Sequence, residues 1–436
     1  MKICSKKDLK VLTGIMAASM LLGGCQAATD PTTKPGSKPI KNDPTIKTEI
    51  NLKKVSDAEY DEDLMDEEYR RYCFDLFTQT VKDYGGSENI MISPASVMMA
   101  LDMVAAGAKG DSLEQLTNLF AAGQGPLTQQ AYASALMDKI NDSKDVKFTC
   151  ANAIWNNSIL LGNEVNMEYV DYVKDTFLAE YIMTDFDEET TDEINAWIDE
   201  HTNHMIKQAI DQLDPQTVMV LVNAIAFEGK WAQPYEDYQI HEGDFTKADG
   251  TTQTVTFLND QTGFFYETEK ATGFIKRYEG GDYAFLAILP KDEFISANEF
   301  AANFTSEDYE EFINSATDKY EVYSKIPEFK SDFTFLMNDT LKNLGCDDIF
   351  DENADLSGIA GDPGDLYVSK VLHKTHIEVD RNGTKAAAVT VVLTDGASAL
   401  SDESLNKEVF CDRPFVYAIV DCDTMAPVFV GTVNEV

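Results

Sequence analysis

The sequence predicts a fold that mixes α-helices and β-strands in one chain. Apolar residues recur at helical spacing in residues 95–106 and 190–210, whereas residues 218–227 (VMVLVNAIAF) form the continuous apolar run typical of a strand buried on both faces. Further strand-like runs span residues 366–379, 414–421 and 427–433. We find no internal repeat, so a repeat architecture is not expected.

A long helix is the first ordered element that we expect. It begins near Glu67, where Cys73, Phe77 and Val81 fall on one face at helical spacing. The pair Gly85-Gly86 that follows is a stop signal for a helix. The helix should therefore pack through one face onto the rest of the domain.

The chain is strongly acidic. Its 436 residues include 35 Lys plus Arg against 76 Asp plus Glu, a formal net charge of −41. Proteins that follow nucleic-acid phosphates need clusters of basic residues, which this chain lacks, so nucleic acid is not an expected partner. The apolar fraction of 44% is ordinary for a globular protein, and the length alone favours two domains.

The N-terminus predicts export. Four lysines precede the apolar stretch Val11–Leu22, which is too short to span a bilayer of about 30 Å. The stretch ends in LGGC (22–25), which resembles the lipobox of bacterial lipoproteins, in which the chain is cut before a cysteine that receives acyl chains. Residues 1–24 would then be a signal peptide, and lipid on Cys25 would hold the secreted protein on the bacterial cell surface. The alternative is ordinary cleavage near Ala27 or Ala28, which would remove Cys25.

Residues 25–60 are expected to be a flexible tether, because they are rich in Thr, Pro, Lys and Asp and lack apolar periodicity. Residues 61–436 would form the folded domain. Its five cysteines are an odd number, which does not indicate a disulfide framework, so we expect them mostly to pack in the core.

Ordered motifs across the domain resemble the serpins, the serine protease inhibitor superfamily. The similarity runs from about residue 65 to the C-terminus. The motifs are NIMISPAS (89–96), LVNAIAFEGKW (221–231), IPEFK (326–330), DLSGI (355–359), EVDRNGTKAAA (378–388), RPFVY (413–417) and PVFVG (427–431).

The resemblance implies an α+β fold with three β-sheets, about eight or nine helices and an exposed reactive-centre loop at about residues 381–413. It also implies two regions in the central sheet. The shutter, where the sheet parts, would contain Ser93, Ser96, Asn223 and His373. The breach, where the loop first enters the sheet, would be marked by Trp231.

The hinge of the loop would comprise Gly383, Thr384, Ala386, Ala387 and Ala388. A loop that becomes a strand needs small side chains and no proline, and proline is absent from Gly383 until Pro414. Period-two alternation would turn the small or β-branched side chains toward the core, namely Thr384, Ala386, Ala388, Thr390 and Val392. Two departures stand out: Arg381 replaces the acidic residue common in the family, which puts the usual salt bridge in doubt, and Val389 is larger than the usual Ala.

The function implied is suicide-substrate inhibition of serine proteases. The protease would attack the loop and form an acyl-enzyme, and insertion of the cleaved loop would then trap it. From Thr384 to Ala397 the inserted strand would measure about 43 Å at ~3.3 Å per residue. The protein would be a monomer with no catalytic residues, metal or other cofactor of its own.

Two counts place the scissile bond differently. The family's spacing forward from Gly383 gives Ala397-Ser398, and the spacing backward from Pro414 gives Glu403-Ser404. We favour the forward count, because inserted length governs trapping, and a small alanine suits an elastase-like protease. Leu400-Ser401 is the second choice and would suit a chymotrypsin-like or broad elastase-like pocket; chymotrypsin-like and subtilisin-like proteases are the further partners that we consider. Residues 390–406 contain no Lys or Arg, which disfavours trypsin-like targets.

Two alternatives belong to other classes. A non-inhibitory serpin would merely be cleaved, or would act as a binding or chaperone-like module. Residues 110–113 spell GDSL, the nucleophile block of a hydrolase family, but that chemistry needs a strand leading into the serine and a late Asp-x-x-His. Ser112 instead follows a helix-like run and is expected to help start the next helix.

Overall fold

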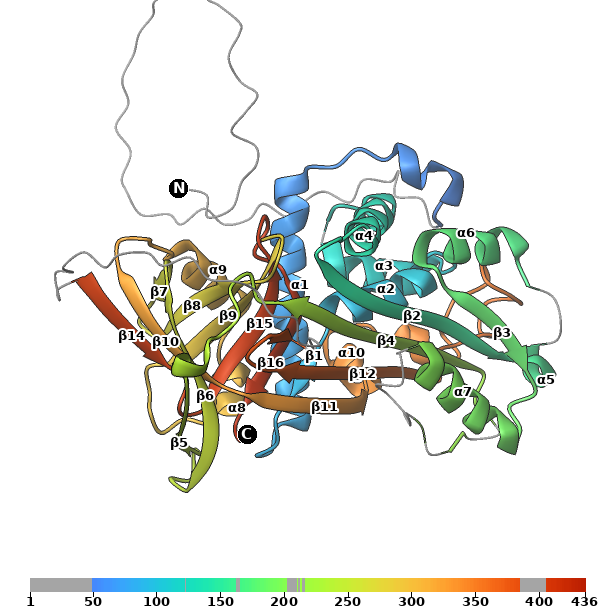
Figure 1. Cartoon of the computed structure of the whole chain (residues 1–436). Coiled ribbons are helices and arrows are strands. Elements are labelled where there is room, and N and C mark those ends of the chain that lie inside the picture. Colours follow the sequence, from blue (N-terminus) through green and yellow to red (C-terminus); the bar gives the residue numbers. More distant parts are fainter. Residues whose placement is uncertain are drawn as a thin grey trace, which may run out of the picture. The chain divides into compact units, whose positions relative to one another are not determined.

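Helices and strands alternate along the described part of the chain in the mixed order that the sequence predicts. The computed structural model describes residues 49–121, 123–161, 165–201, 210, 212–213, 216–384 and 405–436 (Figure 1). Residues from Lys47 onward group into one unit, although the length alone favours two. Within the described ranges, no helix has the length and apolar character needed to cross a membrane.

The helices begin and end at residues that the sequence marks. Before α1 (Glu62–Tyr84), the Asp61 carboxylate accepts the Leu64 N–H, and Gly85 follows its last residue. Ser93 caps α2 (Pro94–Ala105) by accepting the Ser96 N–H. The others are α3 (Gly110–Ala121), α4 (Pro126–Asn141), α5 (Ser158–Leu161), α6 (Met167–Phe177), α7 (Glu188–His201), α8 (Ala297–Ala302), α9 (Ser306–Asn314) and α10 (Asn338–Asn343), with short 3-10 helices η2 (Asp237–Gln239) and η3 (Asp348–Phe350).

Ordered structure starts earlier than the sequence predicts. The tether was expected to extend to residue 60, but Leu52–Asp57 form the 3-10 helix η1, which contacts α4. Val55 is only 5% exposed, so this apolar side chain helps to hold the segment on the domain. Glu49 adds a β-bridge to Lys109.

The candidate functional site lies in a six-stranded sheet, which we call the central sheet (Figure 1). Its β4 is the strand that the apolar run VMVLVNAIAF predicts. The strand order is β11 (Phe329–Leu336), β12 (Lys370–Val379), β13 (Gly383–Thr384), β4 (Met219–Lys230), β2 (Val146–Asn157) and β3 (Glu180–Thr184).

Two further sheets complete the α+β fold. One has the order β1 (Met91–Ile92), β16 (Pro427–Val433), β15 (Phe415–Asp421), β9 (Tyr283–Pro290), β8 (Ala271–Arg277) and β7 (Phe265–Glu267). The other has the order β14 (Asn406–Phe410), β10 (Glu321–Pro327), β6 (Thr252–Thr262) and β5 (Ile240–Thr246). The strand-like runs near the C-terminus therefore form β12, β15 and β16, as predicted.

The central sheet is buried on both faces. On one face, Val220 and Val222 of β4 belong to an apolar cluster with Ile194 and Ile198 of α7. On the other face, the N-terminus of α2 reaches β12 through a hydrogen bond from Ser93 to His373. This double burial explains why β4 is a continuous apolar run rather than an alternating one.

Candidate functional site

The candidate site is the line along which β4 and β12 meet. These strands run parallel and pair directly from Val220 with Lys370 to Ala226 with His376. No other described strand separates them over this length. The sheet is therefore closed in its middle.

At the far end of β4, the two-residue strand β13 lies between β4 and β12. Gly383 pairs with Lys230 and Thr384 with Gly229, while Thr384 also faces Val379 of β12. Both pairings are antiparallel. A Cβ atom on Gly383 would lie 2.1 Å from the Gly229 carbonyl oxygen, so this close approach of two backbones requires glycine.

A tight turn joins β12 to β13. The Asp380 N–H donates to the Gly383 carbonyl over 2.9 Å. The Asp380 carboxylate accepts the N–H groups of Asn382 (2.6 Å) and Gly383 (3.1 Å). β12 and β13 thus already form the start of an antiparallel hairpin inside the central sheet.

Trp231, which directly follows β4, holds this turn. Its indole N–H donates to the Asp380 carbonyl over 2.9 Å, and its backbone N–H donates to the Asn382 carbonyl over 2.9 Å. The indole stacks on Tyr278 with ring centres 4.6 Å apart. The Tyr278 hydroxyl in turn hydrogen-bonds that of Thr384 over 2.6 Å, and Thr384 is fully buried.

Arg381 keeps a salt bridge at this point, which answers the doubt raised by the sequence. Its guanidinium lies 3.0 Å from the Asp237 carboxylate and 4.0 Å from that of Glu328. Glu328 also accepts the Arg381 backbone N–H over 3.3 Å. Because Arg381 and Asp237 are largely exposed, we expect the pair to add little to stability.

The four residues predicted for the shutter are all buried, and hydrogen bonds or strand pairing link them. The Ser93 hydroxyl donates to the Val428 carbonyl over 2.7 Å, and its N–H donates to His373 Nε2 over 3.0 Å. His373 is the strand partner of Asn223. Trp231 stands apart from them, since the eight residues from Asn223 span about 26 Å at ~3.3 Å each.

Burial fixes the protonation of His373. Loss of solvent lowers the pKa of the imidazole to about 3, so the ring is neutral at physiological pH. Nε2 accepts the Ser93 N–H, so Nδ1 carries the proton. Among the described residues, neither His373 Nδ1 nor Asn223 Oδ1 has a hydrogen-bond partner.

The sequence reasoning missed three residues that complete the site. Asn152 of β2 accepts a 2.6 Å hydrogen bond from the Asn223 amide. Tyr278 and Asp380 position Thr384 and the turn, as described above. Asn152 lies in a strand with several other polar residues, so no local signal singles it out, and nothing local marks Tyr278.

Several predicted residues lie outside the described residues. They are Cys25, the hinge residues Ala386, Ala387 and Ala388, and the candidate scissile bonds Ala397-Ser398, Leu400-Ser401 and Glu403-Ser404. Of the predicted hinge, Gly383 and Thr384 are described, and they form β13.

Ser112 of the GDSL motif is at the start of α3, as its structural interpretation predicts. Its hydroxyl accepts the Asp355 N–H over 3.0 Å. This bond ties α3 to the loop before β12, and no strand leads into the serine. The local structure therefore differs from that of a hydrolase nucleophile.

Four cysteines, Cys73, Cys346, Cys411 and Cys422, are buried and free of disulfides. Burial raises the pKa of the Cys346 thiol to about 12. Burial also raises the pKa values of the Cys73 and Cys411 thiols well above the ordinary value of a thiol. These cysteines pack in the core as predicted. No group of three potential ligands able to hold a metal occurs within the described ranges.

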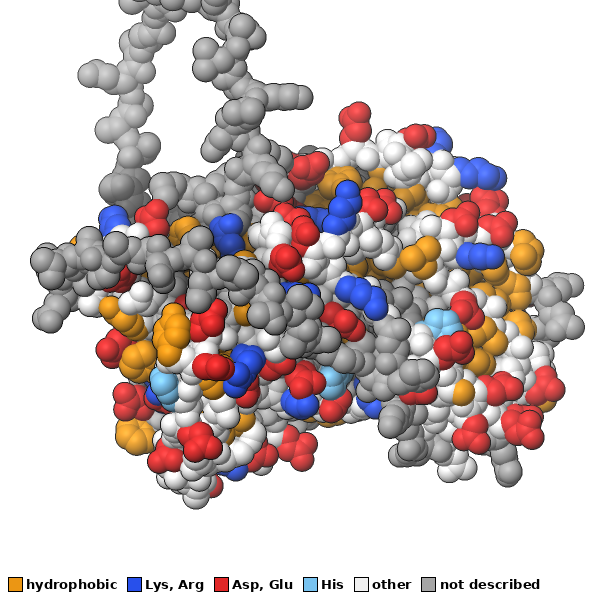
Figure 2. Space-filling view, viewed as in Figure 1, with side chains coloured by type: hydrophobic (Ala, Val, Ile, Leu, Met, Phe, Trp, Pro, Cys, Tyr) orange, Lys and Arg blue, Asp and Glu red, His pale blue; other side chains and the backbone are white. Residues whose placement is uncertain are grey.

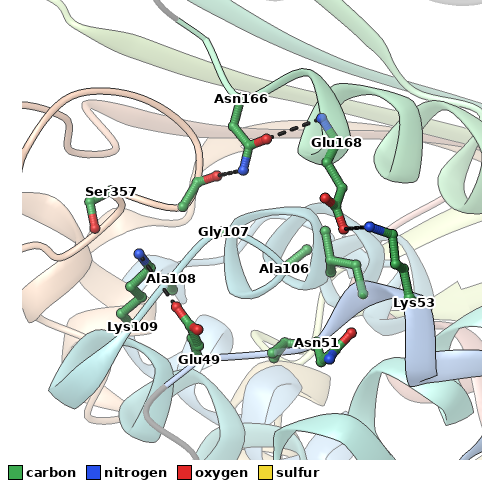
Figure 3. A pocket seen from close by; sticks show the side chains of 13 residues that line it. Glu49, Asn51, Lys53, Ala106, Gly107, Ala108, Lys109, Asn166, Glu168 and Ser357 are labelled. Atoms are coloured by element: carbon green, nitrogen blue, oxygen red, sulfur yellow. Dashed lines mark hydrogen bonds and ion pairs between the residues drawn. The ribbon is translucent and has the colours of Figure 1, made fainter.

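A polar hollow of about 390 Å³ lies under the segment that precedes α1 (Figure 3). Lys53 binds Glu168 of α6 at 3.2 Å, and Lys109 binds Glu49 at 3.5 Å. Asn166 caps α6 by accepting the Glu168 N–H. The charged groups in Figure 3 are thus paired with one another, so the hollow offers no free charge to a ligand.

Comparison with known proteins decides the family. A family model described as Serpin (serine protease inhibitor) matches residues 67–436. The chain belongs to the serpin family. An uncharacterised serpin-like protein of Methanosarcina mazei is 32% identical over 371 residues, which cover 83% of this chain and 85% of that protein.

Two further relatives have more informative names. The leukocyte elastase inhibitor of Bos taurus is 29% identical over 377 residues, which cover 84% of this serpin and 97% of the inhibitor. The crystal structure of tengpin, a thermophilic serpin in its native state, matches with a TM-score of 0.78 and 36% identity, over 87% of this chain and 96% of tengpin. The predicted α+β serpin fold with three sheets is confirmed.

Proposed function

We propose that this serpin is a suicide-substrate inhibitor of serine proteases of the elastase-like type. The observation that carries the proposal is the position of β13 between the parallel strands β4 and β12. A strand that grows from β13 would be antiparallel to both neighbours. It would replace one parallel contact by two antiparallel ones, which are somewhat more stable per residue.

The register of β13 tells which residues would meet if the strand grows. Continued from Thr384 opposite Gly229 and Val379, it places Thr390 between Asn223 and His373. A threonine hydroxyl both donates and accepts. The Thr390 hydroxyl would therefore accept the His373 Nδ1–H and donate to Asn223 Oδ1, two buried atoms that have no hydrogen-bond partner among the described residues.

The same register also places Lys385, the single charged residue of the hinge segment, next to acidic residues. Lys385 would face solvent between Glu228 of β4 and Glu378 of β12. Glu378 currently binds Lys330 at 2.5 Å. Opposite charges on adjacent strands stabilise a sheet modestly, so the single lysine of the hinge favours this register.

The length of β4 supports cleavage at Ala397-Ser398. In the continued register Thr394 pairs with Met219, the first residue of β4, so Ala397 lies three residues beyond the sheet. The protease serine would form an ester with the Ala397 carbonyl and release the amino group of Ser398. Full insertion would then carry the attached protease to the opposite end of the sheet, where distortion of its active site slows hydrolysis of the ester.

The choice of target rests on two supports. Alanine suits the small specificity pocket of an elastase. A relative of this chain is named leukocyte elastase inhibitor. Chymotrypsin-like and subtilisin-like proteases are the next classes to test, with Leu400-Ser401 as the bond.

The experiment incubates the purified chain with elastase-like, chymotrypsin-like and trypsin-like serine proteases and separates the products on denaturing gels. A band stable to SDS near the summed masses supports the proposal. Cleavage of the loop without such a band, for every protease, would instead identify a non-inhibitory serpin. Mass spectrometry of the released C-terminal peptide locates the bond, and a cut outside residues 394–404 would refute the site.

We also propose that the protein is exported and anchored to the bacterial cell surface through lipid on Cys25. The support is the lipobox-like LGGC at residues 22–25. Cells that express the full chain should incorporate a labelled fatty acid into it, and Cys25→Ser should abolish the label. Equal labelling of both forms would contradict the anchor.

A further inference from the structure

A buried lysine lies behind the turn that starts the inserted strand. Lys276 of β8 is 6% exposed, and its ammonium group binds the Asp260 carboxylate of β6. The second carboxylate oxygen of Asp260 accepts the Gln261 N–H over 2.8 Å and the Gln239 amide over 3.2 Å. The pair thus links two different sheets next to the central one.

Two aromatic rings enclose the ammonium group of Lys276. It lies 4.1 Å from the centre of the Tyr235 ring and 5.6 Å from that of Trp231. Tyr235 is buried, and among the described residues its hydroxyl has no hydrogen-bond partner. The cation is therefore a main polar contact that orients this ring, and such contacts strengthen when water is excluded.

The same two residues hold the backbone of the turn. Trp231 donates to the carbonyls of Asp380 and Asn382, as described above. The Tyr235 N–H donates to the Arg381 carbonyl over 2.9 Å. Every carbonyl of the turn Asp380–Asn382 is therefore bound by a donor of a residue whose ring touches Lys276.

We propose that Lys276, paired with Asp260, is a positioning residue for loop insertion. It fixes Trp231 and Tyr235, and through them it holds the turn so that Gly383 and Thr384 remain in register to receive the rest of the strand. This inference rests on the proposed function, because it describes the step that competes with release of the protease.

A contribution to stability does not by itself explain why Lys276 and Asp260 form a buried ion pair here. Burial lowers the pKa of Lys276, which shows that loss of water disfavours its charge. Replacing a buried ion pair by apolar residues of similar size is often neutral or stabilising. Holding Trp231 and Tyr235 in place therefore explains the buried charge of Lys276 better than a contribution to stability does.

The test compares Lys276→Met, Lys276→Arg and the double variant Lys276→Met with Asp260→Leu. We expect the stoichiometry of inhibition, the number of inhibitor molecules consumed per protease trapped, to rise at least about threefold in both methionine variants, as loss of a desolvated cation–π contact allows. The initial rate of loop cleavage should stay within about twofold, because the protease meets the loop before insertion begins. Lys276→Arg should restore most of the wild-type stoichiometry.

The matched control is Lys139→Met. Lys139 also binds a mostly buried carboxylate, that of Asp421, whereas the cation over the Trp231 and Tyr235 rings is Lys276. This control should inhibit like the wild type. The double variant covers the case in which the single variant fails to fold, since it leaves no unpaired charge. An unchanged stoichiometry in a folded methionine variant, or an equal rise in the Lys139 control, would overturn the proposal.

A separate readout distinguishes failure of this inference from failure of the proposed function. If the wild type traps no protease, the proposed function has failed. Insertion can then still be followed by the change in tryptophan emission after an excess of protease cuts the loop. This change should be slower in the methionine variants, and equal rates would refute the role of Lys276 independently of inhibition.

Discussion

At the scale of single residues, the shutter leaves several buried polar atoms without partners. Among the described residues, Ser96 Oγ joins Asn223 Oδ1 and His373 Nδ1 in this group. A buried unsatisfied polar group costs about 1–3 kcal/mol. If the proposed insertion brings Thr390 between Asn223 and His373, its hydroxyl would bond two of these atoms and remove their cost.

The first prediction is that Thr390→Val destabilises only the cleaved protein. The cleaved form should lose about 1–3 kcal/mol of unfolding free energy, because valine keeps the shape but cannot bond His373 or Asn223. Guanidinium unfolding of the intact and cleaved forms measures this. Thr394→Val is the control, since the continued register puts Thr394 at the end of β4. An equal loss in both variants would contradict the register.

The second prediction concerns acid. The pKa of His373 is lowered to about 3 in the folded protein, against about 6.5 in the unfolded chain. Neutral His373 therefore contributes stability above pH ~6.5, and this contribution falls by up to about 1.4 kcal/mol per pH unit as the pH drops toward 3.

Urea unfolding from pH 7.5 to pH 4.5 measures this dependence. His373→Gln should be less stable at neutral pH but should show a shallower fall in acid, because glutamine does not titrate. The carboxylates contribute equally to both proteins, so the difference between the curves isolates His373. Parallel curves would show that His373 does not control the acid response.

At the scale of elements, the important unit is the hairpin of β12 and β13. Its turn is formed and bound before any cleavage, so the costly closure of a new hairpin is already complete. Growth of the strand would then require β4 and β12 to separate from one another while residues are added between them one after another. The side chains that would point into the core therefore determine whether the loop can insert.

The third prediction concerns Ala386, whose side chain would point into the core after insertion. Ala386→Arg should convert an inhibitor into a substrate, because its side chain would enter the core beside Phe227, where a lone charge is costly. Gel assays should show complete cleavage with little stable complex. Lys385→Arg is the matched control, since it carries the same group on the solvent side and should trap protease normally. Full trapping by Ala386→Arg would refute the insertion argument.

The sequence predicted the elements better than their contacts. Periodicity identified α1, α2 and the apolar strand β4, because burial on one or both faces leaves a local pattern. Motif resemblance also pointed to Trp231 and the four predicted shutter residues, which the structure shows to be buried, while their roles stay predictions. The partners of Arg381 and the contact of Lys276 with Tyr235 could not be predicted, because they join segments far apart in the sequence. The early start of order at η1 depends on the burial of Val55 and on the contacts of Glu49 and Lys53 with residues far along the chain, which no periodic pattern reveals.

At the scale of the whole molecule, the most prominent property is the large negative net charge. Acidic side chains are spread over the face shown in Figure 2, with fewer lysines and arginines between them. The net charge of −41 implies self-repulsion in the folded state. Salt shortens the range of this repulsion, from about 30 Å at 0.01 M to about 8 Å at 0.15 M.

The fourth prediction is therefore a salt response. Raising sodium chloride from 0.01 to 0.15 M should raise the melting temperature of the intact chain, while the rate of association with a cationic protease should fall. Calorimetry and stopped-flow inhibition measure the two effects. A melting temperature that falls with salt would contradict the argument.

The segment before α1 is fastened to the domain by ion pairs that lie outside the central sheet. Glu49 binds Lys109, which precedes α3, and Lys53 binds Glu168 of α6. None of these four side chains belongs to β4 or β12, the strands that would part during insertion. If Cys25 carries the proposed lipid, the loop could therefore enter the sheet without loosening the point at which the anchored segment joins the domain.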